Sequence, residues 1–259
     1  MKNSKAVVDE RQAKIVQLLG DNENHRVEEL AELLGYSTIT IRRDLQYLEG
    51  KGIVERRYGS AQLVAPSPPP AEHDIYAAAQ KAIASYAASM VEDGDTIFAN
   101  TGRTTKEFIA ALRGKNITVV TNNLKALEVP INDGVTLMLT GGEISYPALF
   151  GEFTVSSLKT VTASKCFLGV NGISANGGMT TAASMQASVN SLMLSRCIGE
   201  KIVITDSSKV GKQLNFYTGS LNDISCVITD NLADPAEIQQ IRDLGVKVVL
   251  MDVNEFTKR

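Results

Sequence analysis

Ser37-Thr38-Ile39-Thr40-Ile41-Arg42-Arg43-Asp44-Leu45-Gln46-Tyr47-Leu48-Glu49 decides the fold of the N-terminal region, because this stretch predicts a helix with two unlike faces. Ile41, Leu45 and Leu48 recur at intervals of four and three residues, so they share one face and should pack in a core. The opposite face collects donors and cations without an acidic side chain, namely Thr40, Arg42, Arg43, Gln46 and Tyr47. That face is suited to an anionic partner.

The residues before this helix predict two more helices. The first runs from about Glu10 to Leu19, and a short second helix carries an apolar stripe of Leu30, Leu33 and Leu34. Gly35 should end the second helix, and Ser37 should cap the third. Three helices joined by a tight, glycine-containing turn form a helix-turn-helix, whose last helix enters the major groove of DNA.

The segment from Ile53 to Val64 predicts two short strands around a turn, a wing that brings Arg56 and Arg57 near DNA phosphates. The alternative is an amphipathic helix with a solvated basic face and no nucleic-acid partner. Residues 1–60 hold ten basic and ten acidic side chains, so the region has no overall positive charge. Residues 42–57, however, carry five basic against three acidic side chains, which favours DNA at the predicted helix and wing.

Several of these residues form a motif in a fixed order: Thr40 to Leu45, Leu48-Glu49, Gly52, Arg56 and Tyr58 to Ala61. This motif strongly resembles the signature of DeoR-type bacterial transcriptional repressors, except that Ser60 stands where the family usually has a second glycine. The resemblance implies an operator in double-stranded DNA as a partner. It implies DNA contacts by Ser37, Thr38, Thr40, Arg42, Arg43, Gln46, Tyr47, Arg56 and Arg57.

The length of 259 residues suits a small domain and a larger one. We predict a winged helix-turn-helix at 1–64, an extended proline-rich linker at 65–73 and a sensing and oligomerisation domain at 74–259. The start of the chain is polar, and no apolar run is long enough to span a bilayer. The expected location is cytoplasmic, without a membrane partner.

Cysteine and histidine usage limits the chemistry. Cys166, Cys197 and Cys226 are widely spaced in apolar surroundings, which predicts buried reduced thiols and no metal site. The chain has only two histidines, His25 in the predicted DNA-binding domain and His73 in the predicted linker, so the predicted large domain has none. Ser-His and Cys-His catalysis are therefore excluded there, and we expect no cofactor and no enzymatic activity.

The large domain alternates apolar strands with helices. Strands are predicted at 96–99, 117–120, 135–139, 166–170, 201–205, 226–229 and 247–251, and helices at 79–91, 105–112, 186–198 and 235–244. Continuous Val/Ile/Leu runs bounded by polar turns indicate strands buried on both faces, as in a mainly parallel α/β sheet. Ligands of such sheets bind at the carboxyl ends of the strands.

Three polar loops follow predicted strands. In the loop from Asn100 to Thr105, Gly102 lets the backbone approach a ligand, the threonines offer donors and Arg103 adds a positive charge. This loop is suited to a phosphate, although an ordinary strand-to-helix turn capped by threonine fits the spacing equally well. Thr121-Asn122 and Asp206 to Lys209 follow two other strands, and three such loops at one sheet edge favour a pocket.

The resemblance to DeoR-type repressors continues through this region, and it implies a sensor domain similar to sugar-phosphate isomerases and CoA transferases. The implied effector-binding residues are Asn100, Thr101, Gly102, Arg103, Thr104, Thr105, Thr121, Asn122, Gly141, Gly142, Asn171, Gly172, Thr180, Asp206 and Lys209. Asn100 to Arg103 replace the family's usual Asp-Ser-Gly-Thr, and 182–189 lack an acid that is common there. Both changes favour a more anionic ligand, such as a phosphorylated sugar acid.

The sequence thus predicts a repressor of a carbohydrate-utilisation operon, a dimer or tetramer released from DNA by a phosphorylated sugar or sugar acid. One alternative is an isomerase-like enzyme with an accessory DNA-binding module, for which Asp206 and Lys209 are the available acid and base. The other is a repressor whose sensor has lost its ligand and only oligomerises.

Overall fold

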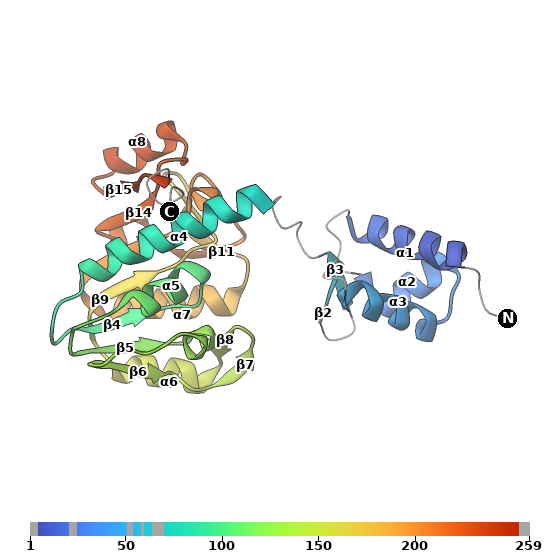
Figure 1. Ribbon diagram of the computed structural model, residues 1–259, viewed down its shortest axis with the longest axis horizontal. Helices are drawn as coiled ribbons and strands as arrows, with labels where there is room; N and C mark the ends of the chain where they lie inside the picture. Colours follow the sequence, from blue (N-terminus) through green and yellow to red (C-terminus); the bar gives the residue numbers. More distant parts are fainter. Residues whose placement is uncertain (1–4, 21–24, 51–53, 58–59, 64–69, 254–259) are drawn as a thin grey trace. The chain divides into compact units, whose positions relative to one another are not determined.

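The protein consists of two compact units, Met1–His73 and Asp74–Arg259, each described here by itself. The computed structural model describes residues 5–20, 25–50, 54–57, 60–63 and 70–253 (Figure 1). The division between the units falls where the sequence predicts the start of the sensor domain. Within the described residues, no helix combines the length and apolar character needed to cross a membrane.

The N-terminal unit is a winged helix-turn-helix, as predicted. Its helices are α1 (Lys5–Gly20), α2 (Val27–Leu34) and α3 (Thr38–Gly50). Strands β2 (Val54–Arg57) and β3 (Ser60–Leu63) pair antiparallel, and the short β1 (His25–Arg26) adds to the free side of β3. The predicted turn at Tyr58-Gly59 lies outside the described residues.

The local signals in the sequence place α3 as expected. Gly35 ends α2 with a left-handed φ of 69°, a conformation that glycine adopts without steric cost. The Oγ of Ser37 accepts a hydrogen bond from the backbone N–H of Thr40 at 3.3 Å, which confirms the predicted cap. Ile41, Leu45 and Leu48 are buried in one core together with side chains from α1, α2 and the wing.

The linker prediction is wrong at its C-terminal end. Residues 70–73 were expected to be extended, but they form the first turn of α4, which spans Pro70–Ser89. Proline is accepted at the first helical position because the N–H that it lacks would have no partner there, and its fixed φ suits the helix. The remainder of the predicted linker, residues 65–69, lies outside the described residues.

The second unit contains a seven-stranded parallel sheet, which confirms the predicted fold class. Its strands are β4 (Thr96–Ala99), β5 (Ile117–Thr121), β6 (Val135–Leu139), β9 (Ala163–Leu168), β12 (Cys197–Ile204), β14 (Cys226–Asp230) and β15 (Lys247–Met251). The order across the sheet is β15-β14-β12-β9-β4-β5-β6. The chain therefore reverses its direction of winding between β4 and β9, a point where parallel sheets commonly bind ligands.

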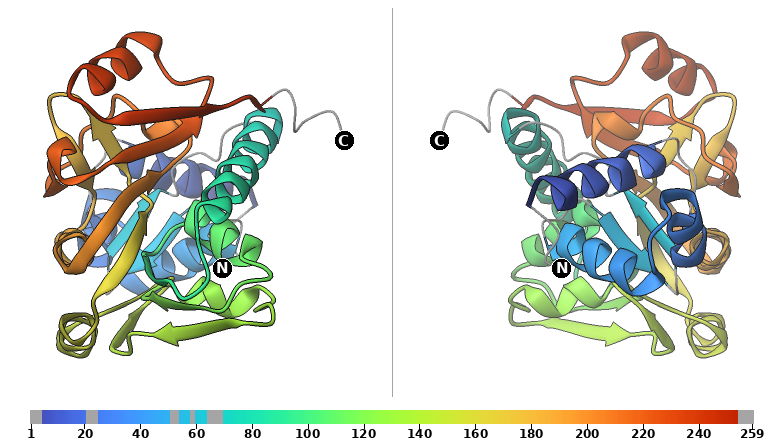
Figure 2. Two further views of the ribbon diagram at one scale, coloured as in Figure 1. Left: turned by 90° about the vertical axis from the view of Figure 1, so that its left-hand side faces the viewer. Right: turned by 90° about the vertical axis from the view of Figure 1, so that its right-hand side faces the viewer.

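Two helix layers cover the sheet (Figures 1 and 2). Helices α4 and α5 (Arg103–Ala111) pack on one face, while α6 (Glu152–Thr160), α7 (Ser184–Arg196) and α8 (Pro235–Asp243) pack on the other. The strands alternate between the two cores: Ile97 of β4 joins the α4 side and Phe98 joins the α7 side. Burial on both faces explains the apolar runs of inner strands such as β4, β5 and β14, whereas the edge strands β6 and β15 keep exposed residues.

The shorter elements of this unit were not predicted from the sequence. Strands β7 (Glu143–Ser145) and β8 (Ala148–Phe150) form a hairpin, and β10 (Gly172–Ser174), β11 (Gly178–Thr181) and β13 (Phe216–Gly219) form a small antiparallel sheet. Short 3-10 helices lie at η1 (Leu124–Glu128), η2 (Ser207–Lys209) and η3 (Leu221–Asp223). These segments contain glycine or polar residues or are only three residues long, so they lack the continuous apolar runs that marked the strands of the parallel sheet.

Candidate functional site

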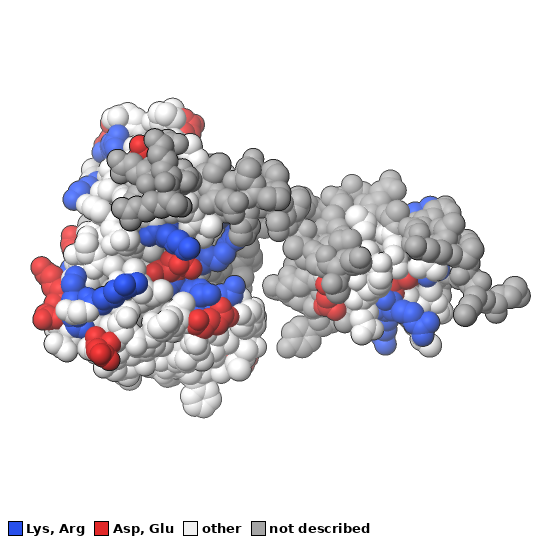
Figure 3. All heavy atoms as spheres, in the orientation of Figure 1, with Lys and Arg blue, Asp and Glu red and all other residues white. Residues whose placement is uncertain are grey.

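The predicted DNA-reading face of α3 is a solvent-exposed cationic surface. Arg42, Arg43 and Gln46 are exposed, and Thr40 is half-exposed. Figure 3 shows Lys and Arg side chains gathered over α3 in the N-terminal unit. The guanidinium of Arg42 lies 3.4 Å from the carboxylate of Glu28, but both side chains are more than half exposed, so the pair is weak and Arg42 can exchange it for another anion.

Five further residues of this unit were predicted to contact DNA, and the structure describes the side chains of three of them. Ser37 and Tyr47 are exposed and Thr38 is half-exposed, so all three can reach a ligand. Arg56 and Arg57 lie in β2, with Ala61 and Ser60 as their register partners, but their side chains lie outside the described part of the structure.

A buried ion pair that the sequence analysis missed holds α3 against α1. The Nε and Nη2 of Arg11 lie 2.5 and 3.1 Å from the two carboxylate oxygens of Asp44, and Gln12 donates a third hydrogen bond at 3.1 Å. The hydrogen bond to Asp44 raises the pKa of Arg11 above its ordinary value. The signal in the sequence is Asp44 itself, an acid beside Leu45 on the core side of the helix. The pair links α1 to α3, the helix that presents Arg42 and Arg43.

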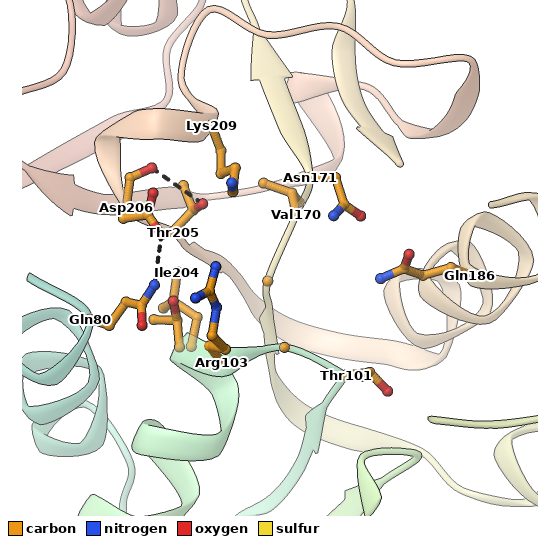
Figure 4. A pocket seen from close by; sticks show the side chains of 13 residues that line it. Gln80, Thr101, Arg103, Val170, Asn171, Gln186, Ile204, Thr205, Asp206 and Lys209 are labelled. Carbon is orange, nitrogen blue, oxygen red and sulfur yellow. Dashed lines mark hydrogen bonds between the residues drawn. The ribbon is translucent and has the colours of Figure 1, made fainter. Parts of the chain in front are cut away.

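In the second unit, a cavity of about 150 Å³ opens at the carboxyl ends of β4, β9 and β12 (Figure 4). Its position matches the reversal of winding between β4 and β9. The lining residues come from α4, three strand-end loops and α7: Gln80, Thr101, Gly102, Arg103, Thr104, Gly169, Val170, Asn171, Gln186, Ile204, Thr205, Asp206 and Lys209. The structure thus brings together seven predicted residues, Thr101, Gly102, Arg103, Thr104, Asn171, Asp206 and Lys209.

Two cations in this cavity are available for a ligand. Figure 4 shows Arg103, from the start of α5, and Lys209, from η2, reaching into it from different sides. Neither side chain makes a hydrogen bond or ion pair with any residue in the described ranges. Helix α5 adds donors, because Gly102 caps it without a side-chain hydrogen bond and its first internal bond runs from Lys106 N to Gly102 O.

Asp206 is the one acid among the residues that line the cavity, and it is already engaged. Gln80 donates to its Oδ2 at 3.0 Å, and the backbone N–H of Ser208 donates to its Oδ1 at 3.2 Å. Gln80 was missed, although a glutamine in the alanine-rich stretch 77–88 is the signal that would have found it. Because Arg103 and Lys209 face a single carboxylate, the cavity carries a net positive formal charge.

On the side of the cavity away from these charges, the lining includes the amide side chains of Asn171 and Gln186. The Oγ of Thr181 lies 2.7 Å from Oδ1 of Asn171 and 2.5 Å from Oε1 of Gln186. A hydroxyl has one proton and can donate to only one of two oxygens, so one amide must turn its NH₂ toward Thr181. Gln186 falls within 182–189, where the family commonly has an acid, and it also lines the cavity. This wall is therefore neutral.

The other eight predicted effector residues do not line the cavity. They are buried within the frame around it or form glycine turns near the β7–β8 hairpin: Asn100, Thr105, Thr121, Asn122, Gly141, Gly142, Gly172 and Thr180. Thr180 accepts from Leu214 N at 3.0 Å, and Thr105 donates to Gly102 O at 3.0 Å. A side chain at Gly142 would meet Phe150 O at 2.2 Å, which explains the glycine without a ligand.

Asn100 stands at the position where DeoR-type repressors usually have an aspartate, and its amide makes hydrogen bonds that an aspartate could not make. Its Nδ2 donates to Gly169 O at 2.8 Å and to the Oδ1 of Asn190 at 2.9 Å, and its Oδ1 accepts from Gly169 N at 2.8 Å. The amide thus ties the end of β4 to the end of β9 and uses both its donors. A carboxylate has no N–H and could not make two of these three hydrogen bonds.

The cysteines play no part in the cavity. Cys166, Cys197 and Cys226 are free and buried, as predicted, and burial raises the pKa of each thiol above its usual value. Over the described ranges, no group of three His, Cys, Asp or Glu side chains is arranged to hold a metal ion.

Comparison with known families agrees with this geometry. The model of the DeoR-like helix-turn-helix domain matches residues 11–67, and the model of the DeoR C-terminal sensor domain matches residues 76–231. The chain belongs to the DeoR family. The second match contains every residue that lines the cavity, so the cationic pocket lies within the sensor domain.

Full-length relatives support the assignment to the DeoR family. The chain is 32% identical to the HTH-type transcriptional regulator YulB of Bacillus subtilis over 96% of this chain and 99% of that one. It is 30% identical to the HTH-type transcriptional regulator GlpR of Haloferax volcanii over 93% and 96%. It is 32% identical to the lactose phosphotransferase system repressor of Streptococcus mutans over 86% and 92%. The chain is a DNA-binding transcriptional regulator and not an enzyme.

Solved structures are more distant. Ribose 5-phosphate isomerase A from Methanocaldococcus jannaschii matches with a TM-score of 0.34 and 15% identity over 56% of this chain and 55% of that one. The delta subunit of eIF2B from Chaetomium thermophilum matches with a TM-score of 0.40 and 18% identity over 85% and 70%. Likeness at this level carries no argument about chemistry.

Proposed function

We propose that this protein represses a carbohydrate-utilisation operon and that an anionic sugar derivative, bound in the cavity of the sensor unit, releases it from DNA. The observation that carries the proposal is a pair of cations, Arg103 and Lys209, which have no partner among the described residues and lie beside the open N-terminus of α5. These groups are the donors that a phosphate requires. A DNA-binding regulator works where the chromosome lies, and we therefore place it in the cytoplasm.

The DNA contacts follow from the exposed face of α3. Arg42, Arg43 and Gln46 would reach base edges and phosphates in the major groove, with Ser37, Thr38, Thr40 and Tyr47 at the margins of the contact. Arg56 and Arg57 would follow the backbone. Helix-turn-helix proteins bind paired half-sites about one helical turn apart, so a dimer or tetramer is the expected binding species.

The cavity favours a particular class of effector. Its cationic end would hold a phosphate or carboxylate, while the neutral amides of Asn171 and Gln186 would exchange hydrogen bonds with hydroxyls. The carboxylate of Asp206 retains acceptor capacity for a further hydroxyl. A hydroxylated carbon chain with at least one anionic group, such as a phosphorylated sugar or sugar acid, satisfies both ends. The lactose phosphotransferase relative is also named for a carbohydrate system.

The test compares matched ligands on the full-length chain. Sugars, their phosphates, the corresponding phosphorylated sugar acids and inorganic phosphate would be screened by thermal shift and then for release of the protein from its own upstream promoter. Free energy of unfolding rises by about 2.7 kcal/mol when a ligand stands at 100 times its Kd. We expect phosphorylated members to raise the melting temperature and release DNA, and the free sugars to do neither.

Variants localise the effect to the cavity. Arg103→Ala and Lys209→Ala should each weaken the response to the anionic ligand about tenfold or more, because a charge-assisted hydrogen bond contributes about 1.5–3 kcal/mol. Lys212→Ala is the matched control, since Lys212 is exposed nearby but does not line the cavity. A response that survives both substitutions would refute the proposed site. If no compound binds in a broad panel, the sensor is better explained as a ligand-blind oligomerisation domain.

A further inference from the structure

Ile39 is an apolar side chain in an unexpected place. It lies in the first turn of α3 and 73% of its surface is exposed. The apolar residues that fix α3 in its core are Ile41, Leu45 and Leu48. Packing among the described residues of the N-terminal unit therefore gives no reason for an isoleucine at this position.

Helical spacing puts Ile39 among the cations. Arg42, Arg43 and Gln46 follow it by three, four and seven residues, and positions at those intervals share one side of a helix. All of them are exposed. Ile39 thus occupies the N-terminal end of the face that would enter the major groove, where the first residues of a recognition helix meet base edges.

The major groove offers an apolar side chain one specific partner. Base edges there display hydrogen-bond donors and acceptors, and the one apolar group is the 5-methyl of thymine. A β-branched residue suits this contact because its χ1 angle is restricted in a helix, so little side-chain entropy is lost when it docks. Arg42 and Arg43 on the same face would hold the helix against phosphates while the methyl contact is made.

We propose that Ile39 reads the 5-methyl group of a thymine in each operator half-site and is a specificity-determining residue of this regulator. The inference rests on the proposed function in one respect, the entry of α3 into the major groove. It adds a base-specific apolar contact to a surface that otherwise offers charges and hydrogen bonds.

The experiment removes the methyl group and nothing else. After footprinting of the upstream promoter, each thymine of the protected site is replaced in turn by deoxyuridine, and affinity for the full-length protein is measured by fluorescence anisotropy at fixed salt. Loss of one buried methyl should weaken binding about fourfold per half-site. We expect one thymine per half-site to show this loss and the remaining thymines to show none.

A double-mutant cycle then assigns the contact to Ile39. Ile39→Ala should bind the natural operator about fourfold more weakly per half-site and should lose no further affinity on the deoxyuridine operator. Ile39→Val should retain the sensitivity to the methyl group. Leu33→Ala is the matched control, because Leu33 is also largely exposed, at 60%, but lies in α2 and not in α3. It should keep the full sensitivity.

Two results would overturn the assignment. One is that no thymine can be replaced with a loss of affinity. The other is an Ile39→Ala variant as sensitive to deoxyuridine as the parent, which means that Ile39→Ala loses the same affinity on both operators and that Ile39 acts without touching the methyl group. None of these outcomes affects the proposed regulator, whose operator binding depends on Arg43 and whose release by ligand is measured on the same promoter.

Discussion

The reading helix and the sensor cavity use cationic side chains in opposite structural settings. Arg42 and Arg43 are adjacent in sequence, and one helix presents both of them. Arg103 and Lys209 are over a hundred residues apart, and the parallel sheet brings them to one cavity. The first site depends on how one helix is oriented, whereas the second depends on the register of several strands. The two sites should therefore fail in different ways.

The largest effect should come from breaking the ion pair between Arg11 and Asp44, which links α1 to α3. Asp44→Asn leaves the Arg11 guanidinium buried without its counter-charge, which should cost about 3–5 kcal/mol of stability. Hydrogen exchange resolved by segment should show the loss in α1 to α3 and not in the parallel sheet. Glu28→Gln, which removes the exposed pair with Arg42, should cost less than about 1 kcal/mol. Similar costs for the two variants would show that Arg11–Asp44 does not fix the helix.

Arg43→Ala should separate DNA binding from ligand binding. Removing one base or phosphate contact in each half-site should weaken operator binding by about 1–3 kcal/mol per half-site, enough to abolish it in a standard mobility-shift assay. Thermal stability and the ligand-induced thermal shift should be unchanged. Arg103→Ala should show the reverse pattern. Undiminished operator affinity in Arg43→Ala would mean that the reading face lies elsewhere.

Asn100→Asp should damage the frame of the cavity without removing a residue that lines it. The carboxylate would face the oxygens of Gly169 and Asn190 with no N–H to donate, at a cost of about 1–3 kcal/mol for each unmet acceptor. We expect a lower melting temperature of the sensor unit and a weaker ligand response, with operator affinity retained. An unchanged melting temperature would show that the amide does not tie β4 to β9.

The smallest effect should be a pH dependence from the sensor's own buried ion pair. Burial alone would raise the pKa of Asp95, but hydrogen bonds from Lys165 at 2.7 Å, Ser164 and the backbone of Glu92 outweigh it and lower that pKa. A carboxyl with a lowered folded-state pKa stabilises the protein fully above its unfolded value, near 3.8, and this stabilisation is lost as the pH falls through the folded value.

Melting temperatures of the full chain between about pH 1 and pH 7, which spans the range where a paired carboxylate is protonated, would measure this effect. Asp95→Asn should flatten the acid limb of the curve, whereas Asp93→Asn, at an exposed position with a single backbone hydrogen bond, should leave it almost unchanged. If the two variants gave the same profile, acid sensitivity would have another origin.

Much of the fold could be predicted because its signals are local. β4, β6 and β15 begin and end where the apolar runs do, because each strand packs at least one face against a helix layer, even at the sheet edges where β6 and β15 lie. Gly35 and Ser37 gave the turn before α3 for the same reason, as conformation and capping involve neighbours in sequence. The start of α4 at Pro70 was missed because proline is compatible with both an extended chain and a first helical turn.

The cavity was only partly predictable. Loops that follow strands could be placed at one sheet edge, and Arg103, Asp206 and Lys209 do line the cavity. Gln80 and Gln186 could not be found this way, because they reach it from helices on opposite faces of the sheet. Buried neighbours such as Asn100 could not be told from lining residues, since one residue of a loop faces the cavity while the next supports it.

The sequence by itself therefore determined the reading helix, its apolar face, the family and the parallel sheet, because periodicity, caps and motifs depend on residues close together in the chain. Tertiary structure decided which polar side chains meet: Arg11 with Asp44, Asn100 with Gly169 and Asn190, and Arg103 opposite Lys209. These pairings depend on strand order and helix packing, which bring together groups that no local pattern connects.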